Sequence, residues 1–401
     1  MDGNASFSEH GDELDGAFDA FVDQLRHAVN DVRASPAFAD SDNRVGAYMF
    51  VLSMLLARIE EDVIFDPDFP YFRSVDVRVR EAGDNPDQRY WTSRLRGGET
   101  YRVWGNRGTA RRVDVQVYAG VPSQPGGGRS AGFLPFEELH IEPDGSFEVY
   151  VSPESHASNW IDCPADATRI FVRQVYSDWE TDLPGEVHVD RVGHEGTPKP
   201  SIAAADMASR LIHAADNLRS RVDLWPKVVE TYSADGANRL STLFDPGSLG
   251  GVHGRLMANG AFDLEPDQAL IVRLWPGSGN YMGIQLGDPW FSSLEYANRQ
   301  SSLSADQARP ATDGTFWFVI ARTDPGTTNW LDTAGRSSGF ILVRYDGIVG
   351  GSARPRDPNY QVVTLDDVWS VLPTETERMT SVERGDALAR RRRHVQRRYG
   401  I

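Results

Sequence analysis

The sequence predicts a mainly β protein with added helices. We expect two jelly-roll-like antiparallel β-sandwich units around a helical middle, with helical N- and C-terminal segments. Three observations lead to this fold class: a motif that occurs twice, two long regions of alternating apolar and polar residues, and three regions with apolar residues at helical spacing. The predicted divisions are residues 1–70, 71–192, 193–246, 247–373 and 374–401.

The repeated motif shows the same order of features in both copies. An Asp-Gly turn opens a strand, a loop and an Asn-Trp-x-Asp tetrad follow, and a second strand ends on Val-Arg. Asn159 lies 15 positions after Asp144, and Asn329 lies 16 positions after Asp313. A period of about 170 residues is far too long for a solenoid repeat. It indicates two related units in which the tetrads occupy equivalent places.

Two helices are predicted in the first 70 residues. Residues 1–11 are expected to be disordered, and residues 14–32 carry apolar side chains at helical spacing. A second helix is expected over residues 43–63, after the Ser35-Pro36 break. Its apolar residues form one broad face that we expect to be buried, namely Val45, Tyr48, Met49, Leu52, Leu55, Leu56 and Ile59.

Residues 71–192 are predicted to form the first β-sandwich unit. The apolar period changes to two, and clusters of Gly, Pro, Asn or Asp separate the segments. The expected strands are residues 74–81, 100–104, 111–120, 145–152, 167–177 and 185–192. Residues 120–132 are expected to be a loop, and the lack of a Gly-Lys-Ser/Thr ending argues against a phosphate loop there.

The remaining chain is predicted as a helical middle, a second β unit and a basic helix. Residues 193–200 form a linker, and helices are expected over residues 201–225 and 226–233. The strands of the second unit are expected at residues 268–276, 280–286, 291–297, 315–322 and 339–346. Seven basic residues near the end of the chain are compatible with nucleic acid. A capping helix whose arginines pair with an acidic surface is the stronger interpretation.

Composition and charge restrict the classes of partner. The 41 basic and 58 acidic residues give a net charge of −17, which opposes general binding to nucleic acid or to anionic membranes. The partner is therefore expected to be a small molecule or a glycan, and a homo-oligomer is compatible with the sequence. Cys163 is the only cysteine, so no intramolecular disulfide can form. With no recognisable signal peptide or apolar run of about 18 residues, we expect a soluble cytoplasmic protein.

Metal and cofactor chemistry have little support. The nine histidines are scattered, H-E-x-x-H does not occur, and there is no cysteine cluster. A Rossmann fingerprint is also missing, and no catalytic triad is recognised. We therefore expect neither a metal site nor a cofactor, although a calcium site built from carboxylates in residues 65–70 stays open.

Two carboxylates beside a tryptophan are the leading catalytic candidates. Asp178 and Glu180 flank Trp179 at the end of a predicted strand. Residues two apart on a strand face the same way, about 7 Å from each other, and such a pair can act as proton donor and acceptor. Trp179 would be a platform for a sugar ring. In the alternative interpretation Asp178 begins a turn, Glu180 is solvated and Trp179 fills the core.

Two other groups of residues are candidates for the site. In the turn at residues 84–90 we assign Asn85 and Asp87 to substrate binding, and Tyr90, or Tyr101 on the next strand, to auxiliary proton donation. The tetrads contribute further candidates for substrate binding, namely Asn159, Trp160, Asn329, Trp330 and Asp332. Because an active site rarely needs two copies, the duplication favours a structural role for the tetrads, with Asn at a tight corner and Trp behind it.

The assembled motifs resemble a bacterial family of unknown function, number twelve-fourteen, which is often found with a companion family, number twelve fifty-four. The segments that carry the resemblance are DNPDQRYW, ETYRVWGNRGTARRV, SNWIDC with FVRQVYSDWE, and TNWLDTAGRSSGFILVRYD. They cover most of residues 70–350. The resemblance implies jelly-roll-like β-sandwich domains with helical additions. It implies no agreed activity, so no catalytic residue is transferred.

Three functions are compatible with these features. The leading hypothesis is a metal-free acid/base enzyme, a hydrolase or lyase, acting on a neutral hydroxylated or glycosidic small molecule. The first alternative is a non-catalytic module that binds carbohydrate or another small molecule, and the second is a structural assembly protein. Pocket geometry discriminates between them, because an enzyme needs a concave site with converging titratable groups and an assembly protein needs a large apolar patch.

Overall fold

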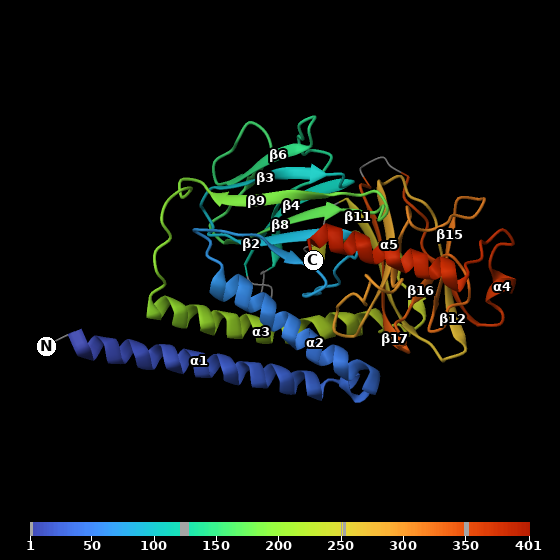
Figure 1. Ribbon diagram of the computed structural model, residues 1–401, viewed down its shortest axis with the longest axis horizontal. Coiled ribbons are helices and arrows are strands. Elements are labelled where there is room, and N and C mark those ends of the chain that lie inside the picture. Colours follow the sequence, from blue (N-terminus) through green and yellow to red (C-terminus); the bar gives the residue numbers. More distant parts are fainter. Residues whose placement is uncertain (1–2, 121–127, 250, 252–253, 349–352) are drawn as a thin grey trace.

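The computed structural model describes residues 3–120, 128–249, 251, 254–348 and 353–401 (Figure 1). Its helices and helical turns are α1 (Gly3–Ala34), η1 (Pro36–Ala39), α2 (Ser41–Arg58), the π-helical η2 (Ile59–Ile64), α3 (Ala204–Tyr232), η3 (Pro246–Leu249), α4 (Val368–Val371) and α5 (Ser381–Tyr399). The strands of the first unit are β1 (Arg73–Val75), β2 (Gln88–Arg94), β3 (Tyr101–Gly108), β4 (Arg112–Ala119), β5 (Arg129–Leu134), β6 (Ser146–Ser152), β7 (Trp160–Asp162), β8 (Ala167–Val175) and β9 (Pro184–Arg191). Those of the second are β10 (Arg239–Leu240), β11 (Arg255–Asp263), β12 (Gln268–Leu274), β13 (Tyr281–Gly287), β14 (Ser302–Ser304), β15 (Phe316–Ala321), β16 (Trp330–Asp332), β17 (Ser338–Asp346) and β18 (Asn359–Thr364).

The two β units have the same topology. In the first unit the sheets have the strand orders β1-β2-β8-β4-β5 and β7-β6-β3-β9, and in the second β10-β11-β17-β13-β14 and β16-β15-β12-β18. Each strand of the first unit therefore corresponds to the strand numbered nine higher. The pairings β6 with β7 and β15 with β16 are parallel, and the other strand pairings described are antiparallel. This confirms the predicted fold class of two sandwich-like units.

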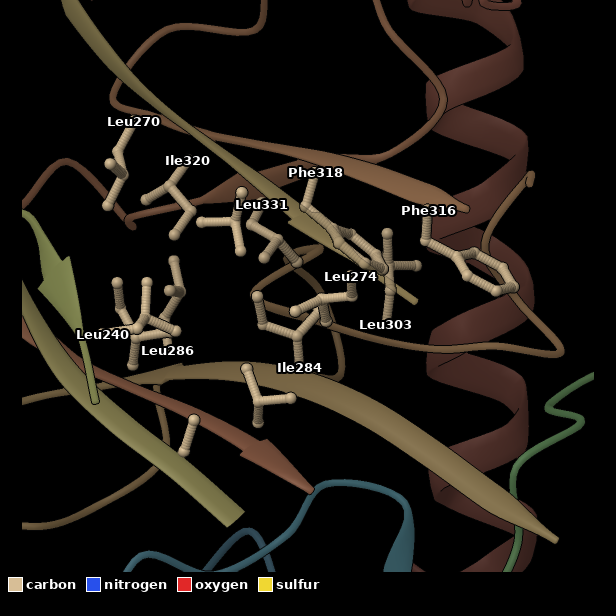
Figure 2. Close-up of a cluster of buried hydrophobic side chains, with 14 of the residues drawn as sticks. Leu240, Leu270, Leu274, Ile284, Leu286, Leu303, Phe316, Phe318, Ile320 and Leu331 are labelled. Carbon is tan, nitrogen blue, oxygen red and sulfur yellow. The ribbon is translucent and has the colours of Figure 1, made fainter. Parts of the chain in front are cut away.

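Alternation along the strands places an apolar core between the sheets of each unit. In the second unit, Figure 2 shows Leu270, Ile320 and Leu331 directed toward Ile284 and Leu286 of the opposite sheet. The first unit has its own core, built mainly from valines of β3, β4, β6 and β8. Side chains that face inward on the strands are removed from water when this core forms. Their burial stabilises the sandwich by about 25 cal/mol per Å² of apolar surface.

The N-terminal and middle helices form one layer beside the β units (Figure 1). Ala28 and Val32 of α1 pack with Phe50 of α2 and Leu218 of α3 in one buried cluster. None of the helices in the described part of the chain is both long and apolar enough to cross a bilayer. The layer differs from the prediction at its ends. α1 begins at Gly3 instead of residue 14, and α3 continues through Pro226 to Tyr232 as a single helix.

The predicted buried face of α2 is wrong except for Leu55 and Ile59, which pack against the buried helical clusters. Val45, Met49 and Leu52 are 73%, 52% and 56% exposed, whereas Phe50 and Met54 on the other side are buried. α2 is apolar on both sides, so its periodicity could not identify the side that packs against α1 and α3.

Several strand predictions also need correction. The predicted strand at residues 74–81 is reduced to β1, because a turn at Asp76 to Val79 interrupts it. Residues 291–297 form no regular strand, and only Ser293 makes an isolated bridge, to Gly287. Residues 121–127 of the predicted loop lie outside the described residues, and β5 occupies its last part.

The basic helix α5 lies across both β units (Figure 1). Three arginines seven residues apart point inward and donate hydrogen bonds to backbone carbonyls: Arg384 to Thr327, Arg391 to Tyr296 and Ser302, and Arg398 to Pro86. Pro86 belongs to the first unit and the other acceptors belong to the second. A capping box between Thr380 and Glu383 begins the helix. The predicted C-terminal helix is confirmed, although its inward-facing arginines bond backbone carbonyls where an acidic surface was expected.

Candidate functional site

The structure does not place Asp178 and Glu180 on a strand. β8 ends at Val175 and β9 begins at Pro184, and the residues between them form turns. Asp178 accepts hydrogen bonds from the backbone amides of Glu180 and Thr181, at 3.0 and 3.4 Å. Glu180 is exposed and forms an ion pair with Arg390 at 3.0 Å. The prediction that Asp178 and Glu180 face the same side of a strand is therefore wrong. Asp178 instead accepts hydrogen bonds from the backbone of a turn, as Asp side chains commonly do.

Trp179 lies in a different environment from its two neighbours. Its ring is 4% exposed and stacks on His394 of α5, with centroids 5.1 Å apart. The guanidinium carbons of Arg391 and Arg398 lie 4.2 and 4.8 Å from the ring centroid. Burial and the neighbouring arginines lower the pKa of His394 to about 2, so the imidazole is neutral. A ring covered in this way is not available as a platform for a sugar.

The seam between the two β units brings four of the predicted residues together. Asp87 accepts hydrogen bonds from Trp179 Nε1 and from Tyr281 Oη, both at 2.8 Å. The Asn85 side-chain amide donates to the same Tyr281 oxygen at 2.9 Å, and the Asn85 backbone amide donates to Tyr90 Oη at 2.9 Å. Tyr281 belongs to the second unit and was not predicted. We define these five residues and Asp84 as the seam cluster.

Burial changes the titration of the seam carboxyl groups. Asp84 is 6% exposed and accepts hydrogen bonds from the backbone amide and hydroxyl of Ser293. Burial raises the pKa of Asp84 to about 6 and also raises the pKa of Asp87, although the hydrogen bond from Tyr281 opposes the shift at Asp87. Burial raises the pKa of Tyr90 as well. These perturbed groups already bond to one another and to the backbone, so they hold the units together.

The remaining predicted residues lie away from the seam. Tyr101 is fully buried in the first core, and its hydroxyl donates to the Pro67 carbonyl at 2.9 Å. Burial raises the pKa of Tyr101 to about 12. At the end of the second tetrad, Asp332 forms an ion pair with Arg299 at 2.8 Å.

The two tetrads occupy equivalent corners, as predicted. Asn159 Nδ2 donates to the Glu148 carbonyl at 2.9 Å, and Asn329 Nδ2 donates to the Trp317 carbonyl at 3.1 Å. Each Asn also bonds a neighbouring loop in both directions, at His140 and at Arg309. The indole groups behind them donate in matching ways, Trp160 to Ser152 and Trp330 to Ala321. These bonds support the structural interpretation of the tetrads.

Sequence patterns for metals and nucleophiles do not identify a site. Within the described ranges, no three or more His, Cys, Asp or Glu side chains are placed to hold a metal ion. Although no catalytic triad is recognised in the sequence, the G-x-S-x-G spacing of a nucleophile elbow occurs at residues 128–132 and 335–339. Ser130 lies within β5 and Ser337 immediately precedes β17. Because the elbow needs a turn from a strand into a helix, neither serine has its context.

A cleft of about 730 Å³ in the helical layer is the candidate functional site. It lies between the end of α1, η1 and α3, and we call it the helical cleft. Its lining residues are Gln24, Asp31, Val32, Ala34, Ser35, Pro36, Asp216, Arg219, Ser220, Val222, Asp223, Pro226, Lys227, Glu230 and Trp290. A volume of this size is in the range of small-molecule sites.

The local sequence explains the shape of the helical cleft. Ser35 and Pro36 end α1 and turn the chain into η1, which separates this end of the helix from α2. On the other side, Pro226 lies inside α3, where it has no amide to donate to the Val222 carbonyl. Val222 and Pro226 both line the cleft, together with the buried Trp290. The lining thus has an apolar part formed by Val222, Pro226 and Trp290.

The charged groups of the helical cleft are exposed and mostly acidic. Lys227 pairs with Asp223 at 2.6 Å, and Arg219 lies 3.6 Å from Asp31. Asp216 and Glu230 make no ion pair with any residue that the structure describes. Four carboxylates therefore face two cationic side chains, and two of the carboxylates are free to bind a positively charged group.

None of the residues predicted for the site lines the helical cleft. The sequence contained two signals for it, the Ser35-Pro36 break and the proline after residue 225, but both were interpreted as helix ends. Trp290 comes from the second β unit, and no local pattern connects it with residues of α1 and α3. The cleft therefore depends on the packing of three distant segments.

Comparisons with known proteins give a fold and no activity. None of the curated proteins matches this chain. An uncharacterized protein from Burkholderia cenocepacia is 28% identical, with a TM-score of 0.83 over 90% of this chain and 100% of that chain. A Vibrio parahaemolyticus protein has a TM-score of 0.45 and 11% identity over 79% of this chain and 98% of its own, which is too little to support an argument. Residues 92–177, within the first β unit, match the family described as Protein of unknown function (DUF1214).

Proposed function

We propose that this protein binds a small, positively charged polar molecule in the helical cleft. The observation that carries the proposal is the concave lining with two unpaired carboxylates, Asp216 and Glu230, beside an apolar part. The ammonium group of such a ligand would pair with these carboxylates, and the apolar part of the ligand would contact Pro226. The net charge of −17 would favour the approach of such a ligand.

Binding is better supported than acid/base catalysis by the predicted residues. Asp178 and Glu180 lie in turns, and Tyr101 bonds the backbone in the core of the first unit. The carboxyl groups with raised pKa values are at the seam, where they bond to Trp179, Tyr281 and Ser293. The proposal therefore selects the non-catalytic binding module over a hydrolase or lyase. Association with a domain of the companion family remains an expectation from the resemblance.

Isothermal titration with a panel of ligands tests the proposal. The panel contains organic amines such as choline, agmatine and spermidine, and neutral glycans of similar size. We expect an amine to bind, and the double variant Asp216→Asn with Glu230→Gln to weaken it by at least tenfold. Glu186→Gln is the matched control, because Glu186 is exposed on β9 and does not line the cleft. The proposal would be contradicted if only neutral glycans bind. It would also be contradicted if the double variant and the control variant bind the amine equally well.

A second candidate function is assembly, which a different observation supports. α2 exposes a stripe of four apolar side chains at spacings of three and four residues, namely Val45, Met49, Leu52 and Leu56. Exposed stripes of this kind are typical of helix–helix contacts between proteins. We propose self-association through this stripe, to be tested by light scattering with size-exclusion chromatography.

Leu52→Glu is the informative variant for assembly. It is expected to convert a concentration-dependent dimer into a monomer, because a buried carboxylate would be left unpaired in the contact. Val382→Glu, at an exposed position of α5, is the control and should not change the mass. A wild-type protein that stays monomeric at high micromolar concentration would contradict this candidate.

A further inference from the structure

A network of buried and partly exposed charges lies between α2, η2 and the first β unit. Ion pairs join Arg58 to Glu61 and Asp62, Arg73 to Glu60, Glu61 and Glu81, Arg94 to Asp62, and Arg169 to Glu61. Four arginines and four carboxylates are connected in this way, so their formal charges balance. His213 lies 3.8 Å from Asp62, and burial lowers the pKa of His213, so it adds no charge at neutral pH.

Arg221 on α3 is an additional cation beside this balanced network. It is 7% exposed, and it makes no ion pair or hydrogen bond with any residue in the described ranges. Its guanidinium carbon lies 5.4 Å from the ring centroid of Trp225, one turn further along α3. Burial, and then repulsion from Arg169 and Arg58, lower the pKa of Arg221 to about 9, although the carboxylates of Glu81 and Glu61 oppose this shift. The group is still charged at neutral pH.

Buried donors that lack a hydrogen-bond acceptor lie near Arg221. Trp225 Nε1 has no hydrogen-bond partner among the described residues, and neither does Arg58 Nε. Buried polar groups are nearly always hydrogen-bonded, and an isolated buried charge is costly. Trp225 Nε1 and Arg58 Nε are donors, and Arg221 adds a guanidinium without an ion-pair partner. The shared requirement is an acceptor with negative charge.

We propose that Arg221 and Trp225 bind a small monovalent oxyanion of the carboxylate class. A carboxylate matches the planar fork of the guanidinium and accepts two parallel hydrogen bonds. One negative charge neutralises the one cation that the network leaves over, whereas a phosphate dianion would add an uncompensated charge. The indole nitrogen of Trp225 supplies a second type of donor. This site is distinct from the helical cleft, whose lining does not include Arg221 or Trp225.

Thermal unfolding at constant ionic strength tests this site. Sodium acetate, formate or phosphate replaces sodium chloride in steps, and the Tm is measured for the wild type and for Arg221→Met. A ligand at about ten times its Kd should raise the wild-type Tm by about 2–4 °C. Arg221→Met should show no response to acetate or formate. Arg26→Met, at an exposed position of α1, is the control for loss of one positive charge and should respond like the wild type.

The outcomes separate the alternatives. An equal response of the wild type and Arg221→Met, or no response of the wild type, overturns the proposal, because water would then satisfy Arg221. A response to phosphate without one to acetate or formate overturns the carboxylate assignment. Trp225→Phe keeps the ring and removes the N–H, so it should bind acetate several times more weakly. If Arg221→Met fails to fold, the comparison of Trp225→Phe with Arg26→Met by acetate titration decides, and equal affinity in these two overturns the proposal.

Discussion

The seam cluster and the helical cleft place carboxyl groups in opposite environments. At the seam, Asp84 and Asp87 are 6% and 1% exposed, and each accepts hydrogen bonds from side chains or amides of other segments. In the cleft, the carboxylates of Asp216 and Glu230 face solvent in a space of about 730 Å³. Perturbed pKa values therefore mark the place where two units are joined. Shape and free charge mark the place where a ligand can enter.

This difference between the two regions affects how a raised carboxyl pKa is interpreted. A raised carboxyl pKa is often used to identify an active site, but burial alone produces the same shift at a structural contact. The seam carboxyls have their hydrogen-bond partners within the chain. Substitutions should therefore affect stability at the seam and ligand binding at the cleft.

The largest expected effect is that of Asp87→Ala. The substitution leaves Trp179 Nε1 as a buried donor without an acceptor, at about 1–3 kcal/mol, and removes the carboxyl group that faces the buried Arg391 and Arg398. The Tyr281 hydroxyl keeps an acceptor, Asn85 Oδ1 at 3.2 Å. The free energy of unfolding, measured with urea, should fall by about 4 kcal/mol. Asp31→Ala in the helical cleft should lower it by less than about 1 kcal/mol, because its partner Arg219 is half exposed. Equal losses of unfolding free energy for Asp87→Ala and Asp31→Ala would show that the seam cluster and the helical cleft contribute equally to stability.

A smaller effect is expected for Asp84→Asn, and it depends on pH. The folded-state pKa of about 6 lies above the ordinary value of 3.8, so the folded protein binds this proton more tightly than the unfolded chain. The resulting stability is fully present below pH 3.8 and is lost as the pH rises through about 6. The difference corresponds to about 3 kcal/mol.

Urea unfolding of the wild type and Asp84→Asn between pH 4 and 8 measures this contribution. The stability of the variant relative to the wild type should increase as the pH rises across this range. A constant difference between the two proteins would mean that Asp84 does not titrate in this window.

Trp179→Phe should have an intermediate effect. The phenyl ring keeps part of the contact with α5 but cannot donate to Asp87. We expect the free energy of unfolding to fall by about 2 kcal/mol, since hydrogen bonds to charged groups contribute about 1.5–3 kcal/mol. Trp104→Phe on β3 is the matched control, because its indole also donates to a carboxylate, Asp190, at a half-buried position. A larger loss for Trp104→Phe would contradict the importance of the seam.

The smallest effect is expected for Asp223→Ala in the helical cleft. Its partner Lys227 follows four residues later, and both side chains are more than half exposed. Such pairs contribute about 0.3–0.5 kcal/mol. The Tm should therefore hardly change. Titration with the amine that binds the wild type should give a higher Kd. A large fall in Tm without a change in Kd would assign this residue to the stability of α3.

The fold could be predicted because its strongest signals are local or repeated. The tetrads and their spacings showed the two units, and alternation showed most strands. The side of α2 that is buried could not be predicted, since Leu52 and Phe50 are both apolar and the packing of α1 and α3 decides between them. β14 was missed for a related reason. Its Ser-Leu-Ser sequence has little strand preference, and pairing with β13 defines it.

The site was less predictable because its residues meet only in three dimensions. The turn at residues 84–90 was correctly singled out, but its partner Tyr281 is 194 positions from Asp87. The strand expected at Asp178 failed because the carboxylate accepts turn amides, an outcome that the structural alternative had included. The cleft depends on Trp290 approaching α1 and α3. No spacing in a single segment predicts such a contact.

The position of α5 in the chain has a consequence for the order of assembly during synthesis. Both β units are translated before α5, yet Arg398 and Arg391 reach the backbone of the first and the second unit, respectively. Each unit can therefore form its own core early, as domains generally do. Until α5 docks, the carbonyls of Pro86 and Tyr296 lack these donors and Trp179 is uncovered. The nascent protein should thus pass through a stage in which the seam hydrogen bonds join the two folded units while Trp179 is still exposed.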